Sequence, residues 1–182
     1  MKRSILIFCC TIFLSLCSCG DESGGNREND PQMLPDETSS IEEDQNIVGF
    51  GGTISGDFFD ISIEDAKWTD VLETSLYTVA PEKEGNKLLC LIFSAQNTSN
   101  ETYNLGAFNA YVDKQAVLPT VVSGEIDGAM VFVGAVASGM EMKAYSVWEL
   151  PENWEEFQLN YFEATGPECQ QYFVIHKEDI GS

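Results

Sequence analysis

The chain contains 182 residues, of which 43% are hydrophobic, and its 30 acidic residues outnumber nine basic ones, which gives a formal net charge of −21. Nucleic acids and anionic lipid headgroups bind proteins through basic surfaces, so this charge argues against both as ligands, and we expect no nucleic-acid partner. Four of the six cysteines fall within the first 19 residues, which directs attention to the N-terminus.

The N-terminus has the layout of a secretory signal, with Lys2 and Arg3 before an apolar region at residues 5–16 that is too short to span a bilayer. The stretch Leu16-Cys17-Ser18-Cys19 follows. It resembles the lipobox of bacterial lipoproteins, in which a Leu three residues before an invariant Cys and a small residue directly before it position the thiol for diacylglyceryl transfer and cleavage. The resemblance implies that residues 1–18 are a lipoprotein signal peptide and that Cys19 is the site of lipid attachment.

Two alternatives to this interpretation remain. Cleavage before Cys17 would place the bulky Leu16 where a small residue is preferred, and an ordinary signal peptide would be removed without lipidation. A diacylglyceryl group on Cys19 carries at least two acyl chains, whereas a single chain is only a marginal anchor. We therefore expect a lipid-anchored protein on the extracellular side of a cell membrane, with membrane lipid as its partner through the acylated Cys19.

Residues 19–46 are rich in Gly, Ser, Asn, Pro and acids, with nine carboxylates against the single Arg27. A segment with so few apolar residues cannot bury enough surface to offset the entropy of ordering it. We expect an acidic, disordered tether, which at random-coil scaling would hold the following domain on the order of 30 Å from the lipid.

Residues 47–182 hold six lysines and 21 acids and have the size of one domain. Alternation of apolar and polar residues with period two dominates this region and is typical of β-strands. Along residues 59–63 every second residue is apolar, and the phase then slips by one position so that Ala66 and Trp68 continue the apolar face. Such a slip predicts a β-bulge.

Residues 87–97 indicate a central strand, because both faces are apolar at first. Its better core face consists of Leu89, Leu91, Phe93 and Ala95, since the opposite face continues into Ser94 and Gln96. Further strands are expected at 108–112, 131–135 and 142–150, and the last two strands flank a turn at 165–171. About seven short strands separated by turns predict an all-β fold, an antiparallel β-sandwich over residues 47–182.

The strand and turn stretches KLLCLIFSAQNTS, AFNAYVDKQAV and VASGMEMKAYSVWELPENWEEFQL resemble the immunoglobulin-like domain of unknown function in Gram-positive surface lipoproteins, a group related to secreted immunoglobulin-like antigens. The resemblance covers roughly residues 60 to 182 and departs from the family where no proline precedes Gly139. It implies an immunoglobulin-like β-sandwich at the cell surface with an unknown ligand. The matching positions are Asn97, Phe108, Asp113, Gly139, Tyr145, Trp148, Glu149 and Pro151.

The sequence offers no assembled catalytic or metal site. His176 is the only histidine, G-x-S-x-G is absent, and zinc would need a larger set of N or S ligands. Four aspartates between Asp57 and Asp70 lack the glycine-centred loop of an EF-hand, so calcium binding stays a secondary alternative. We expect no catalytic residues, no metal ligands and no cofactor.

Two further features bear on ligands and stability. Trp154 follows Pro151 in a polar stretch and is the candidate ligand contact, although it could instead cap the end of the sandwich. Cys90 and Cys169 remain after signal removal and could form a disulfide in an oxidising compartment, or stay as separate thiols.

These features together favour a membrane-anchored extracellular lipoprotein whose domain is a noncatalytic binding or scaffolding module for an unknown protein, peptide or glycan. The alternative is an envelope enzyme, such as a hydrolase that uses paired carboxylates, since the domain contains acids enough for a pair.

Overall fold

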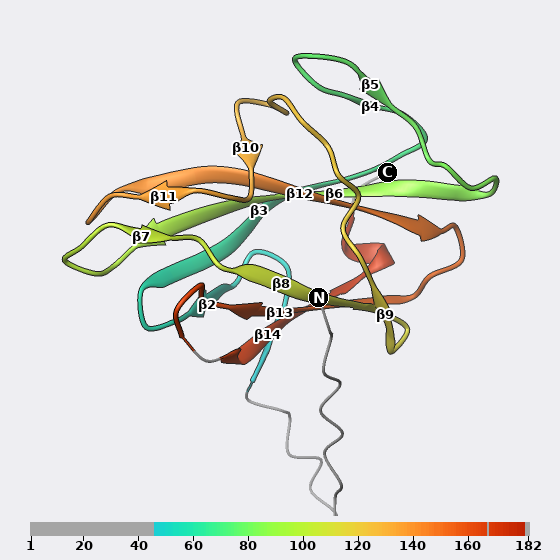
Figure 1. The fold of residues 1–182 in the computed structure, drawn as a ribbon. Coiled ribbons are helices and arrows are strands. Elements are labelled where there is room, and N and C mark those ends of the chain that lie inside the picture. The colour runs from blue at the N-terminus through green and yellow to red at the C-terminus, as the bar shows by residue number, and fades with distance from the viewer. Residues whose placement is uncertain (1–45, 167, 181–182) are drawn as a thin grey trace, which may run out of the picture. The chain divides into compact units, whose positions relative to one another are not determined.

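A computed structural model describes residues 46–166 and 168–180 of the chain, which form two packed five-stranded sheets (Figure 1). Sheet I has the strand order β1-β14-β13-β8-β9 and sheet II the order β10-β12-β6-β3-β2. The strands of sheet I are β1 (Ile47–Val48), β14 (Glu168–His176), β13 (Glu156–Phe162), β8 (Ala107–Val112) and β9 (Gln115–Val117). Those of sheet II are β10 (Met130–Val131), β12 (Glu141–Pro151), β6 (Asn86–Asn97), β3 (Phe59–Thr69) and β2 (Thr53–Ser55).

Two small ribbons and one short helix complete the described part. They are the pairs β4 (Leu72–Glu73) with β5 (Thr78–Val79) and β7 (Tyr103–Asn104) with β11 (Ala135–Val136), and the 3₁₀ turn η1 (Lys177–Asp179). The predicted all-β sandwich is confirmed. The structure has more two-residue strands than the sequence predicted, and the single strand expected at 131–135 is replaced by β10 and β11. Two of the short strands pair in parallel: β1 with β14 and β10 with β12. Within the described residues there is no helix with the length and apolarity needed to cross a membrane.

The centre of sheet II is the antiparallel set β3-β6-β12, which confirms that residues 87–97 form a central strand. The pairing of β3 with β6 shifts register between Ile63 and Asp65, which confirms the β-bulge. Because the bulge absorbs one residue, Ala66 and Trp68 stay on the same face as Ile61 and pack against the core between the sheets.

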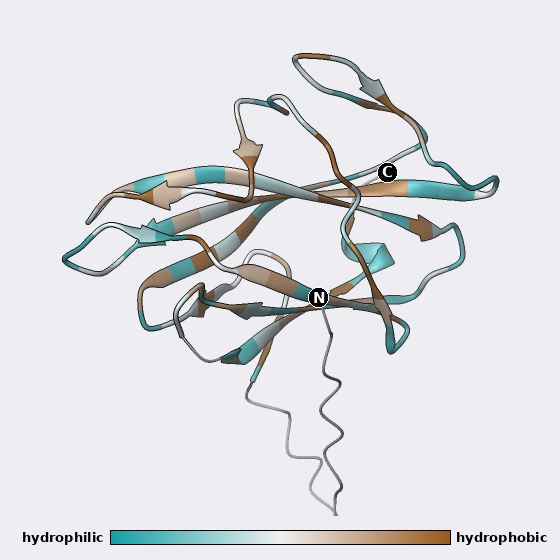
Figure 2. Ribbon diagram, viewed as in Figure 1, coloured by the Kyte–Doolittle hydropathy of each residue, from teal (hydrophilic) through white to brown (hydrophobic). Residues whose placement is uncertain are grey.

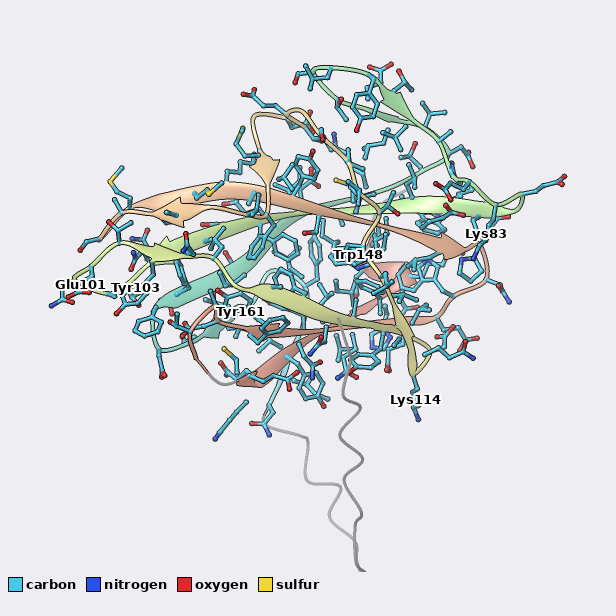
Figure 3. All side chains as sticks on the ribbon, viewed as in Figure 1. Lys83, Glu101, Tyr103, Lys114, Trp148 and Tyr161 are labelled. Atoms are coloured by element: carbon cyan, nitrogen blue, oxygen red, sulfur yellow. The ribbon has the colours of Figure 1, made fainter. Side chains whose placement is uncertain are left out.

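The main core lies between the two sheets and is rich in aromatic side chains. Phe93 of β6 stacks on Phe108 of β8 with ring centroids 4.8 Å apart, and Trp148 meets Phe157 edge to face at 5.1 Å. Trp148 and Tyr161 are labelled in Figure 3, on β12 and β13 respectively, and both are buried. Since full burial of one large apolar side chain contributes about 1.5–3 kcal/mol, this layer supplies most of the stabilisation of the sandwich.

The second face of β6 is buried as well from Leu88 to Ile92, the part of the strand where the sequence is apolar on both faces. Leu88, Cys90 and Ile92 form an outer cluster with Tyr145 and Val147 of β12. Two stretches that we call the cover segments, residues 70–80 and 118–133, lie over this face and contribute the remaining buried members: Leu72, Val122, Ile126 and Ala129. Figure 1 shows the β4–β5 ribbon and the β10 loop on the side of sheet II that faces away from sheet I.

Several residues that carry the family resemblance fix turns. Asn97 is buried, and its amide Nδ2 donates to the carbonyl oxygens of Glu101 and Val136, each at 2.8 Å. Gly139 has φ 68°, a backbone conformation that favours glycine, and its N–H donates to the Asn97 carbonyl. Asn97 and Gly139 therefore join two loops at the same end of the sandwich, without the proline that the family often has before this glycine.

Asp113 and Glu149 also fix loops, through hydrogen bonds that their side-chain carboxylates accept. The Asp113 carboxylate accepts the backbone N–H groups of Glu155 and Glu156 at 3.2 and 3.0 Å. The Glu149 carboxylate accepts three bonds, from the N–H groups of Glu82 and Lys83 and from the side-chain amide of Asn86. Asp113 and Glu149 thus have structural roles, because their carboxylates hold loops in place.

Candidate binding surface

The sequence candidates for lipidation and ligand contact have different outcomes. The signal peptide, Cys19 and the tether up to residue 45 lie outside the described residues. Trp154 is only 1% exposed, so the expectation that its side chain is exposed is wrong. Its ring meets Trp68 edge to face at 5.7 Å and lies 6.4 Å from Phe157, which places it as the cap at the end of the main core. Pro151 ends β12 three residues before it, and the turn at Glu152 and Asn153 folds the indole inward.

Cys90 and Cys169 are both free thiols, so the disulfide alternative is not realised. Cys90 lies in the outer cluster of sheet II, whereas Cys169 packs against the main core, so the layer of sheet II separates them. Cys169 also lies within β14 rather than in the predicted turn, because that strand begins at Glu168. Burial raises the pKa of the Cys90 thiol to about 12. Burial, together with the charges of Glu163, Asp57 and Glu168, raises the pKa of Cys169.

His176 is the last residue of β14 and is exposed, as the sequence indicated. Its backbone N–H donates to the Asp179 carboxylate at 2.8 Å, which starts η1. The histidine lines an open hollow of about 510 Å³ with Trp154, Glu155 and the first residues of η1. No hydroxyl or thiol of Ser or Cys lines this hollow, so no nucleophile is paired with the imidazole there.

Glu163 is a buried carboxylate that sequence reasoning missed. Its side chain is 3% exposed, and Oε1 accepts the backbone N–H groups of Phe58 and Phe59 at 2.7 and 3.1 Å. A Cβ atom at Gly56 would lie 2.4 Å from the same oxygen, so only glycine permits this approach. The carboxylate thus ties the β13–β14 hairpin of sheet I to the β2–β3 turn of sheet II.

A polar hollow of about 590 Å³ opens beside Glu163, with Asp57, Glu168 and Cys169 in its lining. Within residues 46–166 and 168–180, no group of three or more His, Cys, Asp or Glu side chains is placed to hold a metal ion. The bonds that the Glu163 carboxylate accepts give it a structural task in joining the sheets.

The most distinctive surface of the domain is apolar and lies on the cover segments. Of the ten large apolar side chains that are exposed among the described residues, seven belong to these two segments. Leu118 is 88% exposed and Val121 is 92% exposed. Figure 2 shows hydrophobic residues along both segments. We call this surface the cover face; its exposed apolar residues are Val71, Leu76, Tyr77, Leu118, Val121, Met130 and Val133.

A groove of about 220 Å³ runs into the cover face at the edge of β12. Two stretches of the second cover segment bond to this edge: the Thr120 N–H donates to the Val147 carbonyl at 2.7 Å, and the Phe132 N–H to the Tyr145 carbonyl at 2.8 Å. The groove lies between them, and most of its lining is apolar, with Pro119, Val121, Val122, Val131, Phe132 and Val147 among the lining residues.

The two cover segments are joined to each other and to sheet II by polar contacts. The Ser75 N–H donates to the Glu125 carbonyl, and the Glu125 N–H donates to the Ser75 hydroxyl, both at 2.9 Å. The Tyr145 hydroxyl donates to the Gly124 carbonyl at 2.8 Å. Burial, with the nearby Cys90 and Tyr77, raises the pKa of Tyr145, so its hydroxyl keeps the proton that makes this bond. These hydrogen bonds therefore hold the two cover segments in a defined position on sheet II.

Comparisons with known proteins agree with the fold. No family model and no curated protein matches the chain. Among solved structures, a Bacillus subtilis protein described as a "putative lipoprotein (ycdA)" superposes with TM-score 0.54 at 15% identity, over 70% of this chain and 39% of that protein's length. An uncharacterized beta-sandwich protein from Clostridium difficile 630 has TM-score 0.51 at 11% identity, over 72% of this chain and 93% of its own. The yjhA protein from Bacillus subtilis also has TM-score 0.51, at 13% identity over 70% and 97% of the two chains. At these identities the likeness shows the fold alone, a β-sandwich.

Proposed function

We propose that the chain is a lipid-anchored protein of the extracellular side of a cell membrane, and that its immunoglobulin-like sandwich is a noncatalytic module that binds another protein through the cover face. The concentration of seven exposed large apolar side chains on the two cover segments, one of which also contains most of the groove lining, carries this proposal. Exposed apolar surface in such a concentration marks interaction sites, because it costs free energy to leave in water. A glycan ligand is less well supported, since Trp154 is buried.

The lipobox-like stretch and the neighbour described as a "putative lipoprotein" support the proposed location. The position of β1 fits it too. The described chain begins in sheet I, where β1 pairs with β14, whereas the cover face lies beyond sheet II. An anchor attached through β1 would leave the cover face free for a partner.

The anchoring is tested by Cys19→Ser, which we expect to leave an uncleaved or released protein that no longer partitions into detergent. The control is Cys17→Ser, which removes the rival attachment site and should partition like the unmodified chain. If Cys17→Ser loses the lipid and Cys19→Ser keeps it, cleavage occurs before Cys17. If both variants partition normally, the chain is not anchored through either thiol.

The binding role is tested by photo-crosslinking in the intact envelope. A photoreactive amino acid at Val121 should form a discrete protein adduct, because that side chain is almost fully exposed on the cover face. The control position is Gln170, which is exposed on β14 of sheet I. Adducts at both positions alike, or at neither, would contradict the proposed binding face.

A further inference from the structure

From the charges around the cover face we infer the chemistry of its partner: an apolar protein segment that carries lysine or arginine. This inference rests on the proposed function, because it assumes that the cover face binds a protein. Beyond the proposed function, the charges indicate which kind of partner sequence the cover face selects.

The cover segments carry charges of one sign only. Residues 70–80 and 118–133 contain four carboxylates and no lysine, arginine or histidine. Asp127 pairs with Lys67, and Asp70 lies 3.6 Å from the ammonium of Lys87. Those two lysines come from β3 and β6 of the sheet beneath.

The other two carboxylates, Glu73 and Glu125, have no ion pair among the described residues. Both are exposed. They lie near one another in the fold, because Ser75, two residues after Glu73, exchanges two hydrogen bonds with the backbone of Glu125. Leu76 and Tyr77, two of the exposed apolar residues, follow directly after that junction. The cover face thus combines an apolar surface with two uncompensated negative charges.

These charges argue against two other occupants of the face. A second copy docked through the same face would bring Glu73 and Glu125 close to the same carboxylates, and residues 47–182 contain 21 acids and only six lysines. An anionic membrane surface would be repelled for the same reason. A cationic apolar segment satisfies both features, since the apolar residues can enter the groove while lysine or arginine neutralises the carboxylates.

The test selects ligands for the full-length chain, held in neutral detergent, from a phage-displayed library of random peptides. We expect the enriched peptides to combine Leu, Ile, Val or Phe with Lys or Arg. A synthetic copy of one enriched peptide should bind Glu73→Gln/Glu125→Gln about fivefold more weakly than the unmodified chain. Added salt should weaken its binding to the unmodified chain, because salt screens exposed charges.

The charge-matched control is Glu101→Gln/Glu168→Gln, which removes two exposed carboxylates outside the cover segments and should leave the affinity unchanged. Equal affinity for both double variants would overturn the inference about charge. Enriched peptides without basic residues would overturn it too. Neither result touches the proposed function, which fails separately if the Val121 crosslinker captures no protein, or if Val121→Ser leaves peptide binding unaltered.

Discussion

The main core and the outer cluster use opposite faces of the same two strands, β6 and β12, yet they are closed by different kinds of structure. The main core is closed by the long strands β13 and β14 of sheet I, which pair residue by residue from Glu156 to Asn160 before the register shifts. The outer cluster is closed by the cover segments, in which β4, β5 and β10 have two residues each. Burial is complete on both faces of β6 from Leu88 to Phe93, and beyond that only the core face stays fully buried, because Ser94 and Gln96 on the outer face are half-buried.

The difference indicates that the two halves of the domain have different local stabilities. A segment held by a few apolar anchors and scattered hydrogen bonds opens at lower free energy than a strand within a continuous ladder. Regions that bind partners are commonly drawn from the less stable part of a protein. The cover segments should therefore open without unfolding of the sandwich, and four substitutions test this expectation.

The largest effect is expected in the main core. Phe157→Ala removes a ring that is fully buried between the sheets and contacts both Trp148 and Trp154. It should lower the free energy of unfolding by about 4 kcal/mol, because the cavity cannot be filled by the surrounding strands. Urea unfolding monitored by tryptophan fluorescence measures the change. A loss below about 1 kcal/mol would mean that the sheets can collapse around the cavity.

Ile126→Ala should have a smaller effect, confined to the cover segments. Ile126 is buried in the outer cluster, and its removal should cost about 2 kcal/mol. Cys90 reports the opening, since its thiol is fully buried beneath the cover and its pKa of about 12 keeps it unreactive. The rate of Cys90 alkylation should rise about 30-fold, the factor that 2 kcal/mol represents.

The matched measurement for Ile126→Ala is amide hydrogen exchange in β13. If the cover opens alone, exchange in β13 should not change while Cys90 becomes accessible. Equal acceleration of both would show that the two halves unfold as one unit.

Glu149→Gln should cost about 1 kcal/mol at pH 7 and make stability less dependent on pH. Partial burial raises the pKa of Glu149, but the bonds from Glu82, Lys83 and Asn86 outweigh this effect and hold the pKa below its ordinary value of 4.5. A carboxylate with a lowered pKa stabilises the fold above the pKa of the unfolded chain, and this contribution is lost as pH falls through the folded pKa. The difference between the two proteins should therefore shrink from pH 6 to pH 3.

Thermal unfolding across that pH range measures the effect. Glu152→Gln is the control, because Glu152 makes only a 3.6 Å exposed pair with Lys87 and should contribute within about 0.5 kcal/mol. A gap for Glu149→Gln that widens toward pH 3 would contradict the assigned direction of the pKa shift.

The smallest effect is expected at the surface of the cover. Val121→Ser should change the free energy of unfolding by less than about 0.5 kcal/mol, because the side chain is exposed. The neighbouring Val122→Ser, at a buried position, should cost clearly more. Similar costs at both positions would mean that Val121 contributes to the fold and is not reserved for a partner.

The regular strands were predictable because their residues alternate strictly. The bulge in β3 and the core face of β6 follow from the phase of apolar residues alone. The apolar character of Cys90 and Ile92 was visible in the sequence, but the segments that cover them were not predictable, since their two-residue strands are too short to show a period. Trp154 was misplaced because a polar sequence context does not reveal that a turn folds the ring onto Trp68. Glu163 gave no signal, because its partners lie more than 100 residues away.

The short strand β1 has a mechanical consequence. Its two residues lie opposite β14, Ile47 opposite Tyr172 and Val48 opposite Phe173, and the Tyr172 N–H donates to the carbonyl of the preceding Asn46, before the chain turns toward β2 in the other sheet. Tension between an anchored N-terminus and a partner on the cover face would reach this pairing first. Detachment of β1 would lengthen the connection between the anchor and the sandwich by up to about 3.5 Å for each residue released, while β3, β6 and β12 keep their pairing. Strand β1 would then detach under tension before the cover face is disturbed.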